Sequence, residues 1–363
     1  MHDPDFHRDF CRARLIGAVT LGLCLAVAGH ARAEEKTDFK VAWSIYAGWM
    51  PWGYAADNGI VQKWADKYGI AIEVTQFNDY VESMNQFTAG GYDAVTLTNM
   101  DGLSIPAAGG VDTTAVIVGD FSAGNDAVIL KDGTALTDIA GRPVNLVEFS
   151  VSHYLLARAL DSVGLSERDV SIVNTADPDM VGAFQTPDVT AMVTWNPMAS
   201  EIAALPGATK VFDSAQIPGE IIDLMVANTE VLQDNPDFGK ALAGIWYETT
   251  ALMVADTPEG AAARAAMGAA SGTDGAGYEA QLAATRLFDK PAEAVAFVNS
   301  PDLATTMDHV RGFLFDKGLL GPTAPSADAV GIELPSGQVL GDGANVKLRF
   351  TDDWMQMAAD GAL

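Results

Sequence analysis

The chain has 363 residues, of which 49% are hydrophobic, and a formal net charge of −27. This length fits two domains or one large domain, and the hydrophobic content is sufficient for real cores and argues against disorder. Lysine and arginine are scarce, which disfavours nucleic acid and anionic membrane surfaces as partners, because neutralising phosphates requires clustered basic side chains. Most of the excess acid is expected to serve solubility.

The first 33 residues are typical of a cleavable secretory signal. Basic residues precede an apolar run from Leu15 to Ala28, and an Ala-x-Ala sequence at 31–33 places the cleavage site before Glu34. The apolar run is short for a membrane span. Both cysteines lie in this segment, so the exported chain has no thiol or disulfide chemistry. We therefore expect a periplasmic protein with no direct membrane insertion after cleavage.

From Phe39 onward, short apolar segments alternate with amphipathic ones, which predicts strands alternating with helices. The first part predicts strands at 41–45, 72–77, 94–98 and 114–118, and helices at 52–68, 80–89 and 105–108. After a break at 122–124, it predicts strands at 127–130, 143–147, 170–174 and 189–194, and helices at 153–163 and 180–185. A strand at 224–227 precedes mostly helical sequence, with helices at 238–255 and 301–317 and a loop at 267–277 rich in small residues.

This alternation predicts mostly parallel sheets with helices on both faces, in two successive α/β units. The C-terminal third of the chain is expected to pack onto the first unit and to complete it. We expect one lobe of residues 38–124 plus 226–363 and a second lobe of 125–225, with a hinge near Gly124 and Leu224. In open parallel sheets, ligands bind beyond the carboxyl ends of the strands, so the loops there are the place to look.

The loops at these strand ends contain no lysine or arginine, but they hold eight carboxylates. Glu82 and Asp120 are expected to face solvent. Asp223 precedes an apolar strand and either contacts a ligand or anchors its loop. Two or three carboxylates can share one ligand, because more unpaired charge in one cleft would be prohibitive. The main candidates for hydrogen-bond acceptors are Asp79, Asp101, Glu148 and Glu220.

Aromatic residues accompany these carboxylates. Trp49 and Trp195 stand near prolines where a strand passes into a loop, and together with Tyr46 they are candidates to enclose a ligand. Trp52 and Tyr54 begin a helix and are expected in the core. Carboxylates and aromatic faces suit a small cation or a neutral amide-like molecule. An anion would find only backbone N–H groups and hydroxyls.

The segment from Glu148 to His153 ends a predicted strand and opens a helix with serines. Free N–H groups at such a helix start can bind an oxygen atom, so Ser150 and His153 are candidate supporting hydrogen-bond donors. The alternative is an ordinary helix cap. Motifs of nucleophilic, phosphate-binding, zinc-peptidase or dinucleotide sites are absent from the sequence. Without these motifs we expect no cofactor and no enzymatic activity. The exported chain has only two histidines, so we also expect no metal site.

Several segments resemble one family in order along residues 38–330: 44–57, 85–93, 152–156 and 193–197. The chain resembles the periplasmic solute-binding proteins of the nitrate/sulfonate/taurine class of ABC importers. Within that class, segments 41–53, 79–85, 99–112, 145–156 and 216–226 are similar to the branch encoded beside urea carboxylase genes.

The resemblance implies a class II periplasmic-binding-protein fold, with two three-layer α/β lobes joined by a two-strand hinge. It also implies a monomer that closes on a small molecule and docks on ABC permease subunits. The class name suggests anions, whereas loops without lysine or arginine favour guanidinium, with urea next. A taurine-like, sulfonate-like or pyrimidine-like ligand, or an enzyme or sensor on the same fold, remains the alternative.

Overall fold

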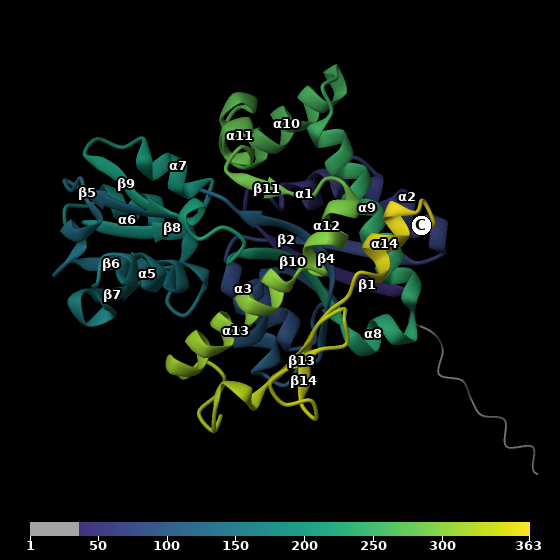
Figure 1. Ribbon diagram of the computed structural model, residues 1–363. Coiled ribbons are helices and arrows are strands. Elements are labelled where there is room, and N and C mark those ends of the chain that lie inside the picture. The colour runs from purple at the N-terminus through teal and green to yellow at the C-terminus, as the bar shows by residue number, and fades with distance from the viewer. Residues whose placement is uncertain (1–35) are drawn as a thin grey trace, which may run out of the picture. The chain divides into compact units, whose positions relative to one another are not determined.

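The protein is described here by a computed structural model, which covers residues 36–363, so the predicted signal peptide lies outside the described residues. The strands of the described part form two separate sheets (Figure 1). Within residues 36–363, no helix combines the length and the apolar character that a membrane crossing requires.

The first sheet is nine-stranded, in the order β13-β12-β14-β4-β10-β3-β1-β2, with β11 paired to β4. Its strands are β1 (Asp38–Ser44), β2 (Ala71–Phe77), β3 (Ala94–Thr98), β4 (Thr113–Ser122), β10 (Ile222–Asn228), β11 (Thr285–Leu287), β12 (Gly331–Glu333), β13 (Val339–Leu340) and β14 (Val346–Phe350). Strand β1 is parallel to β2 and β3, but β10 is antiparallel to both β3 and β4. The sheet is therefore mixed rather than mostly parallel, because β10 brings the chain back from the second sheet in the opposite direction.

The second sheet is five-stranded, in the order β7-β6-β8-β5-β9. Its strands are β5 (Ala127–Lys131), β6 (Pro143–Leu146), β7 (Ser171–Asn174), β8 (Ala191–Thr194) and β9 (Ala208–Asp213). Strand β6 is parallel to β7 and β8, whereas β5 is antiparallel to β8 and β9. Three helices gather around this sheet in Figure 1: α5 (Val151–Ser162), α6 (Met180–Gln185) and α7 (Met198–Ala203).

The remaining helices belong to the segments before β4 and after β10. They are α1 (Met50–Asp57), α2 (Ile60–Tyr68), α3 (Tyr80–Thr88), α4 (Asn99–Gly102), α8 (Thr229–Asp234), α9 (Pro236–Val254), α10 (Pro258–Ala270), α11 (Gly275–Leu282), α12 (Pro291–Val298), α13 (Pro301–Asp316) and α14 (Asp353–Ala359). Trp52 of α1 is buried and stacks on Trp246 of α9, with ring centroids 5.8 Å apart, so the expectation that it lies in the core is confirmed.

Three sequence predictions are corrected here. The helix predicted at 52–68 is divided into α1 and α2 at Gly59, whose φ of +76° is a left-handed conformation that glycine adopts without strain. The loop between helices predicted at 267–277 is present but is confined to 271–274, because alanine extends α10 and Asp274 caps α11 by accepting a hydrogen bond from Gly277 N at 2.8 Å. The short strands β11 to β14 in the C-terminal third were not predicted.

Candidate functional site

A small cavity of about 10 Å³ lies where loops from both sheets meet. Tyr46 and Trp49 follow β1, Thr98 ends β3, and Trp195 follows β8. Strand β10 begins where β3 and β4 end, because it runs antiparallel to both. The lining therefore collects at strand ends, as expected for α/β folds, and none of it is basic: Tyr46, Trp49, Tyr80, Thr98, Asp126, Val151, Trp195 and Asp223.

Aromatic rings form one continuous wall of the cavity. Tyr46 and Trp49 meet edge to face with centroids 5.1 Å apart, Trp49 lies 5.6 Å from Tyr80, and Tyr80 lies 5.6 Å from Trp195. The Trp195 Nε1 atom donates a hydrogen bond to the carbonyl oxygen of Ile45 at 3.2 Å, which fixes its ring against the loop after β1. Aromatic faces at such a wall attract a cation or stack on a planar ligand.

Four buried aspartates, which we call the carboxylate cluster, surround this wall: Asp101, Asp120, Asp126 and Asp223. Asp223 in β10 lies opposite Thr98 of β3 on one side and opposite Asp120 of β4 on the other. Asp126 comes from the segment between β4 and β5, and Asp101 from α4. The pairing of β10 with β3 and β4 therefore assembles the cluster from distant parts of the chain.

The donors that reach the cluster leave several oxygens unpartnered. Asp101 Oδ2 accepts hydrogen bonds from the hydroxyls of Tyr80 at 2.8 Å and Thr98 at 2.9 Å, and Asp120 Oδ1 accepts one from the Tyr46 hydroxyl at 3.0 Å. Three buried oxygens have no protein donor: Asp101 Oδ1, Asp120 Oδ2 and Asp223 Oδ2. Buried polar atoms without partners are uncommon in folded proteins and point to a missing partner.

Burial makes these acids hard to ionise. It raises the pKa of Asp101 to about 6 and that of Asp126 to about 7. The pKa values of Asp120 and Asp223 are also raised by burial, and the charge of Asp120 raises the pKa of Asp223 further. In the described part of the chain, no lysine, arginine or histidine contributes to these shifts. Within residues 36–363, no group of His, Cys, Asp and Glu side chains is arranged to hold a metal ion.

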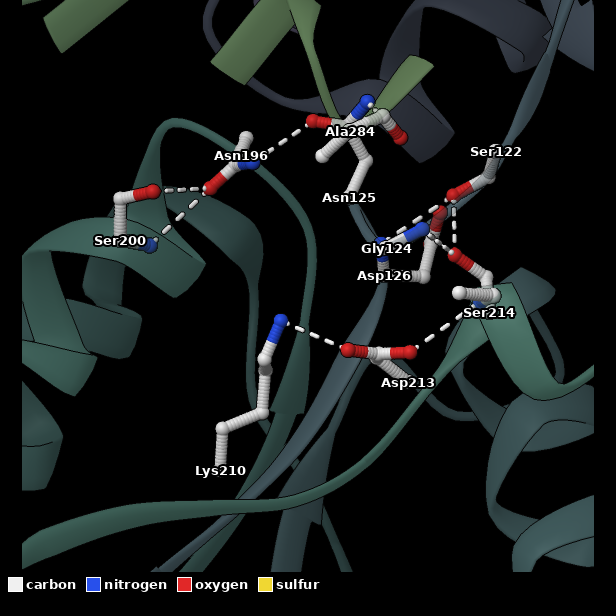
Figure 2. Close-up of polar contacts among 11 residues, drawn as sticks. Ser122, Gly124, Asn125, Asp126, Asn196, Ser200, Lys210, Asp213, Ser214 and Ala284 are labelled. Carbon is white, nitrogen blue, oxygen red and sulfur yellow. Dashed lines mark hydrogen bonds and ion pairs between the residues drawn. The ribbon is translucent and has the colours of Figure 1, made fainter. Parts of the chain in front are cut away.

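The segment that joins β4 to β5 positions Asp126 (Figure 2). Ser214 Oγ lies 2.6 Å from Ser122 Oγ and accepts a hydrogen bond from Gly124 N at 2.7 Å. Ser122 Oγ in turn accepts a hydrogen bond from Asp126 N at 3.2 Å. These contacts hold the backbone on both sides of Asn125.

Asn125 joins this segment to the loop that carries Trp195. Its Oδ1 atom accepts a hydrogen bond from Asn196 Nδ2 at 2.6 Å, and its Nδ2 atom donates one to the Ala284 carbonyl oxygen at 3.0 Å. Asn196 Oδ1 also accepts a hydrogen bond from Ser200 Oγ at 2.6 Å. The position of the Trp195 ring is therefore coupled to the same segment that positions Asp126.

The structure brings five of the sequence-predicted site residues together. Tyr46, Trp49, Trp195 and Asp223 line the cavity, and Asp101 is hydrogen-bonded to three of its lining residues, including Val151 N at 3.3 Å. That they contact a ligand stays a prediction.

Three other candidates have protein partners of their own. Glu220 accepts hydrogen bonds from the Arg158 guanidinium at 2.8 and 2.9 Å and from the Tyr154 hydroxyl at 2.6 Å. His153 Nε2 lies 2.6 Å from Glu167 Oε1, and burial lowers the pKa of His153 to about 4. Ser150 caps α5 by accepting a hydrogen bond from Ser152 N at 3.2 Å.

Asp79 and Glu148 line a different cavity, of about 270 Å³, together with Asp177. Asp79 caps α3 by accepting a hydrogen bond from Glu82 N at 2.8 Å. Asp177 accepts one from Tyr80 N at 3.3 Å, so Tyr80 lies between the two cavities.

Sequence reasoning missed Asp120, Asp126, Tyr80 and Thr98 as site residues. The expectation that Asp120 faces solvent is wrong, because β4 continues to Ser122 and the side chain is fully buried. One available signal was the position of Asp120 two residues after the apolar run 115–118, near the end of a strand.

The NMT1-like family matches residues 32–269 of the chain. A binding protein of Brucella abortus is 23% identical over 187 residues, which are 50% of this chain and 57% of that protein. The taurine-binding periplasmic protein of Escherichia coli K12 is 27% identical over 120 residues, 32% of this chain and 37% of that protein. The chain thus spans about half the length or less of these curated relatives, which are named as binding proteins rather than enzymes.

Solved structures identify the fold. The alkanesulfonate-binding protein of Xanthomonas axonopodis pv. citri, bound to MOPS, superposes with a TM-score of 0.65 at 15% identity, covering 80% of this chain and 96% of that one. A Candida albicans protein described as having the generic periplasmic-binding-protein fold superposes with a TM-score of 0.60 at 12% identity, covering 80% and 92%. The predicted α/β periplasmic-binding-protein fold is therefore confirmed.

Proposed function

The chain belongs to the NMT1-like family, and from this premise we propose that it is a periplasmic solute-binding protein of an ABC importer that captures guanidinium. Relatives named as binding proteins, one of them periplasmic, support the general role. Support for the ligand comes from the cavity. Delivery would require two lobes, 38–124 plus 226–363 and 125–225, that close by bending at the connections near Gly124 and Leu224.

The observation that carries the ligand proposal is the set of three buried carboxylate oxygens without donors, next to a wall of aromatic rings. Guanidinium is a planar cation with N–H donors around its whole edge, so it can satisfy carboxylate oxygens in its plane while its faces lie on aromatic rings. Its charge also offsets the ionised carboxylates, for which no basic side chain lines the cavity.

Urea fits less well because it is neutral and carries a carbonyl oxygen that needs a donor. The hydroxyls of Tyr46 and Tyr80 already donate to Asp120 and Asp101. Urea would therefore leave the cluster's charge uncompensated and its own oxygen without a strong partner.

Sulfonates are disfavoured by charge, although the relatives named above include binding proteins for taurine and alkanesulfonate. A sulfonate group needs basic or backbone donors, and the carboxylate cluster would repel it. The cavity volume of about 10 Å³ corresponds to about one water molecule, so charge rather than volume discriminates between these ligands.

Calorimetry with guanidinium chloride, urea, taurine and nitrate at millimolar concentrations tests the ligand, with potassium chloride as the control for ionic strength. We expect guanidinium to bind and to raise the melting temperature, because a ligand of the folded state stabilises it by mass action. Urea should bind at least about tenfold more weakly, the equivalent of one charge-assisted hydrogen bond. Tight binding of taurine together with no binding of guanidinium would overturn the proposal.

The transport role needs a separate test in cells. Uptake of isotopically labelled guanidine should fall when the gene is deleted and recover when it is restored. Unchanged uptake in the deletion strain, with intact guanidinium binding in vitro, would argue for a sensor instead of a transport component.

A further inference from the structure

Asp120 and Asp223 face each other directly across the antiparallel pair of β4 and β10. Side chains that are directly opposite on such strands point to the same face of the sheet and lie close together. Here the two carboxyl groups belong to directly facing residues, whose Cβ atoms lie about 4.5–5.5 Å apart in such pairs, and both are buried. Two carboxylates at such a distance in a buried site cannot both remain ionised, so the pair is suited to hold one shared proton.

The groups around this pair offer no positive charge. The Tyr46 hydroxyl faces it from the loop after β1, Asp126 from the segment between β4 and β5, and Tyr278 from α11. Asp101 of α4 acts on Asp126 from the other side of the cluster. All of these groups are acids, so within the described part of the chain only a proton or a bound cation can offset the charge of the pair.

The same carboxylate oxygens can accept either a proton or the N–H groups of a bound cation. Asp120 Oδ2 and Asp223 Oδ2 each lack a donor from the protein. A proton shared between the two carboxyl groups supplies one donor, and the N–H groups of a planar cation can supply more. Proton and cation would therefore occupy the same oxygens, and their binding is mutually exclusive.

We propose that the Asp120–Asp223 pair exchanges its shared proton for the ligand, so that each guanidinium that binds releases one proton to solvent. This inference rests on the proposed function. In the exchange one O–H bond breaks, the proton leaves to water, and the cation takes its place, so the charge of the buried cluster does not change. An electroneutral exchange avoids burying an additional charge, which would be costly.

The exchange makes binding depend on pH. Below the pKa of the pair, the proton competes with guanidinium, and the affinity should fall about tenfold for each pH unit when one proton is exchanged. Above that pKa the pair is already ionised and the affinity should level off. The protein would therefore hold its ligand best in neutral to alkaline surroundings.

Calorimetry of guanidinium binding in buffers with different ionisation enthalpies measures the protons released. For the wild-type protein we expect about one proton per guanidinium near pH 7 and fewer as the pH rises. In Asp223→Asn the amide can donate to Asp120, so the release should fall to the fraction of a proton that Asp126 contributes, even if binding is weaker. Asp126→Asn should keep most of the release, and Asp66→Asn, a change on the exposed face of α2, should keep all of it.

Carbon-13 NMR of the aspartate carboxyl groups tests the shared proton without any ligand. Besides Asp126 and Asp177, for which burial raises the pKa to about 7, we expect one further carboxyl group to stay protonated above pH 6 in the wild type, and this further signal to disappear in Asp223→Asn. Guanidinium binding without proton release at pH 6–7, or ionisation of every aspartate below pH 5, would overturn the inference. If guanidinium does not bind but the NMR signal is present, the proposed ligand is wrong and the shared proton stands.

Discussion

Two groups of acidic side chains in the protein are held in opposite ways. The first is an ion-pair network in which Glu220 pairs with Arg158 and Glu167 pairs with Lys317, while the neutral His153 ring adds a hydrogen bond to Glu167. The second is the carboxylate cluster, whose donors are tyrosine and threonine hydroxyls and a backbone N–H group. Both groups contain buried or half-buried carboxylates, but only the first has positive partners within the described chain.

The pKa shifts follow this difference. Burial acts to raise the pKa of Glu220, but hydrogen bonds from Arg158 and Tyr154 outweigh it and the pKa is lowered. Burial raises the pKa of Asp101 and Asp126, and no basic group opposes it. A buried acid with its own cation therefore contributes to the structure, whereas a buried acid without one is available to a ligand.

The largest expected effect is a difference in guanidinium affinity between substitutions in the carboxylate cluster and in the ion-pair network. Asp126→Asn should weaken guanidinium binding about 10- to 100-fold, because a hydrogen bond to a charged group contributes about 1.5–3 kcal/mol. Glu167→Gln, the matched change in the ion-pair network, should alter the affinity by no more than about twofold, as expected for a site that does not touch the ligand. Calorimetry at pH 8 measures both, and equal losses would abolish the distinction between the two groups.

The second effect concerns stability against pH. The folded-state pKa of Asp126 is raised to about 7, above its unfolded value, so its contribution to stability is present at low pH and is lost as the pH rises toward 7. The wild type should therefore lose about 2–3 kcal/mol relative to Asp126→Asn between pH 5 and pH 8, since each pKa unit corresponds to about 1.4 kcal/mol. Thermal unfolding of both proteins without ligand measures the difference. A difference that does not vary with pH would show that Asp126 is ionised throughout.

The third effect tests the aromatic wall. Trp195→Ala should weaken guanidinium binding about tenfold, because a desolvated cation–π contact contributes about 1–2 kcal/mol. Trp195→Phe keeps an aromatic face and should recover most of the affinity. Opening the wall should also admit methylguanidinium, which the wild type should bind more weakly than guanidinium. Equal affinities of the Ala and Phe variants would remove the ring from the ligand site.

The smallest effect belongs to the ion-pair network. Glu220→Gln should lower the free energy of unfolding by about 1 kcal/mol or less, because Arg158 is 36% exposed and solvent screens the pair. At pH 8 this loss is opposite in sign to the gain expected for Asp126→Asn. Thermal unfolding at pH 8 measures the stability of both variants. If Glu220→Gln were more stable than the wild type, Glu220 would behave like an acid of the carboxylate cluster and not like an ion-paired one.

Much of the fold could be predicted because local patterns reflect burial. The strand at 94–98 and the helix at 180–185 were predicted with the bounds that the structure has. Trp49 and Trp195 were also found as cavity candidates, because an aromatic residue near a proline at the end of a strand stands out in the sequence. Local sequence patterns do not predict Arg158 as the partner of Glu220, because Arg158 lies within helix α5 rather than in a loop at a strand end.

Local sequence patterns are enough to predict the alternation of strands and helices, the fold class and the presence of acids and aromatic rings at the strand ends. Which acids lack a donor or a basic partner depends on how the chain packs in three dimensions. Asp120, Asp126 and Asp223 are separated by up to about a hundred residues, and they meet because β10 returns between β3 and β4 in the antiparallel direction. Pairing register and burial are properties of the assembled sheet, and local sequence patterns do not specify which distant strand becomes the neighbour.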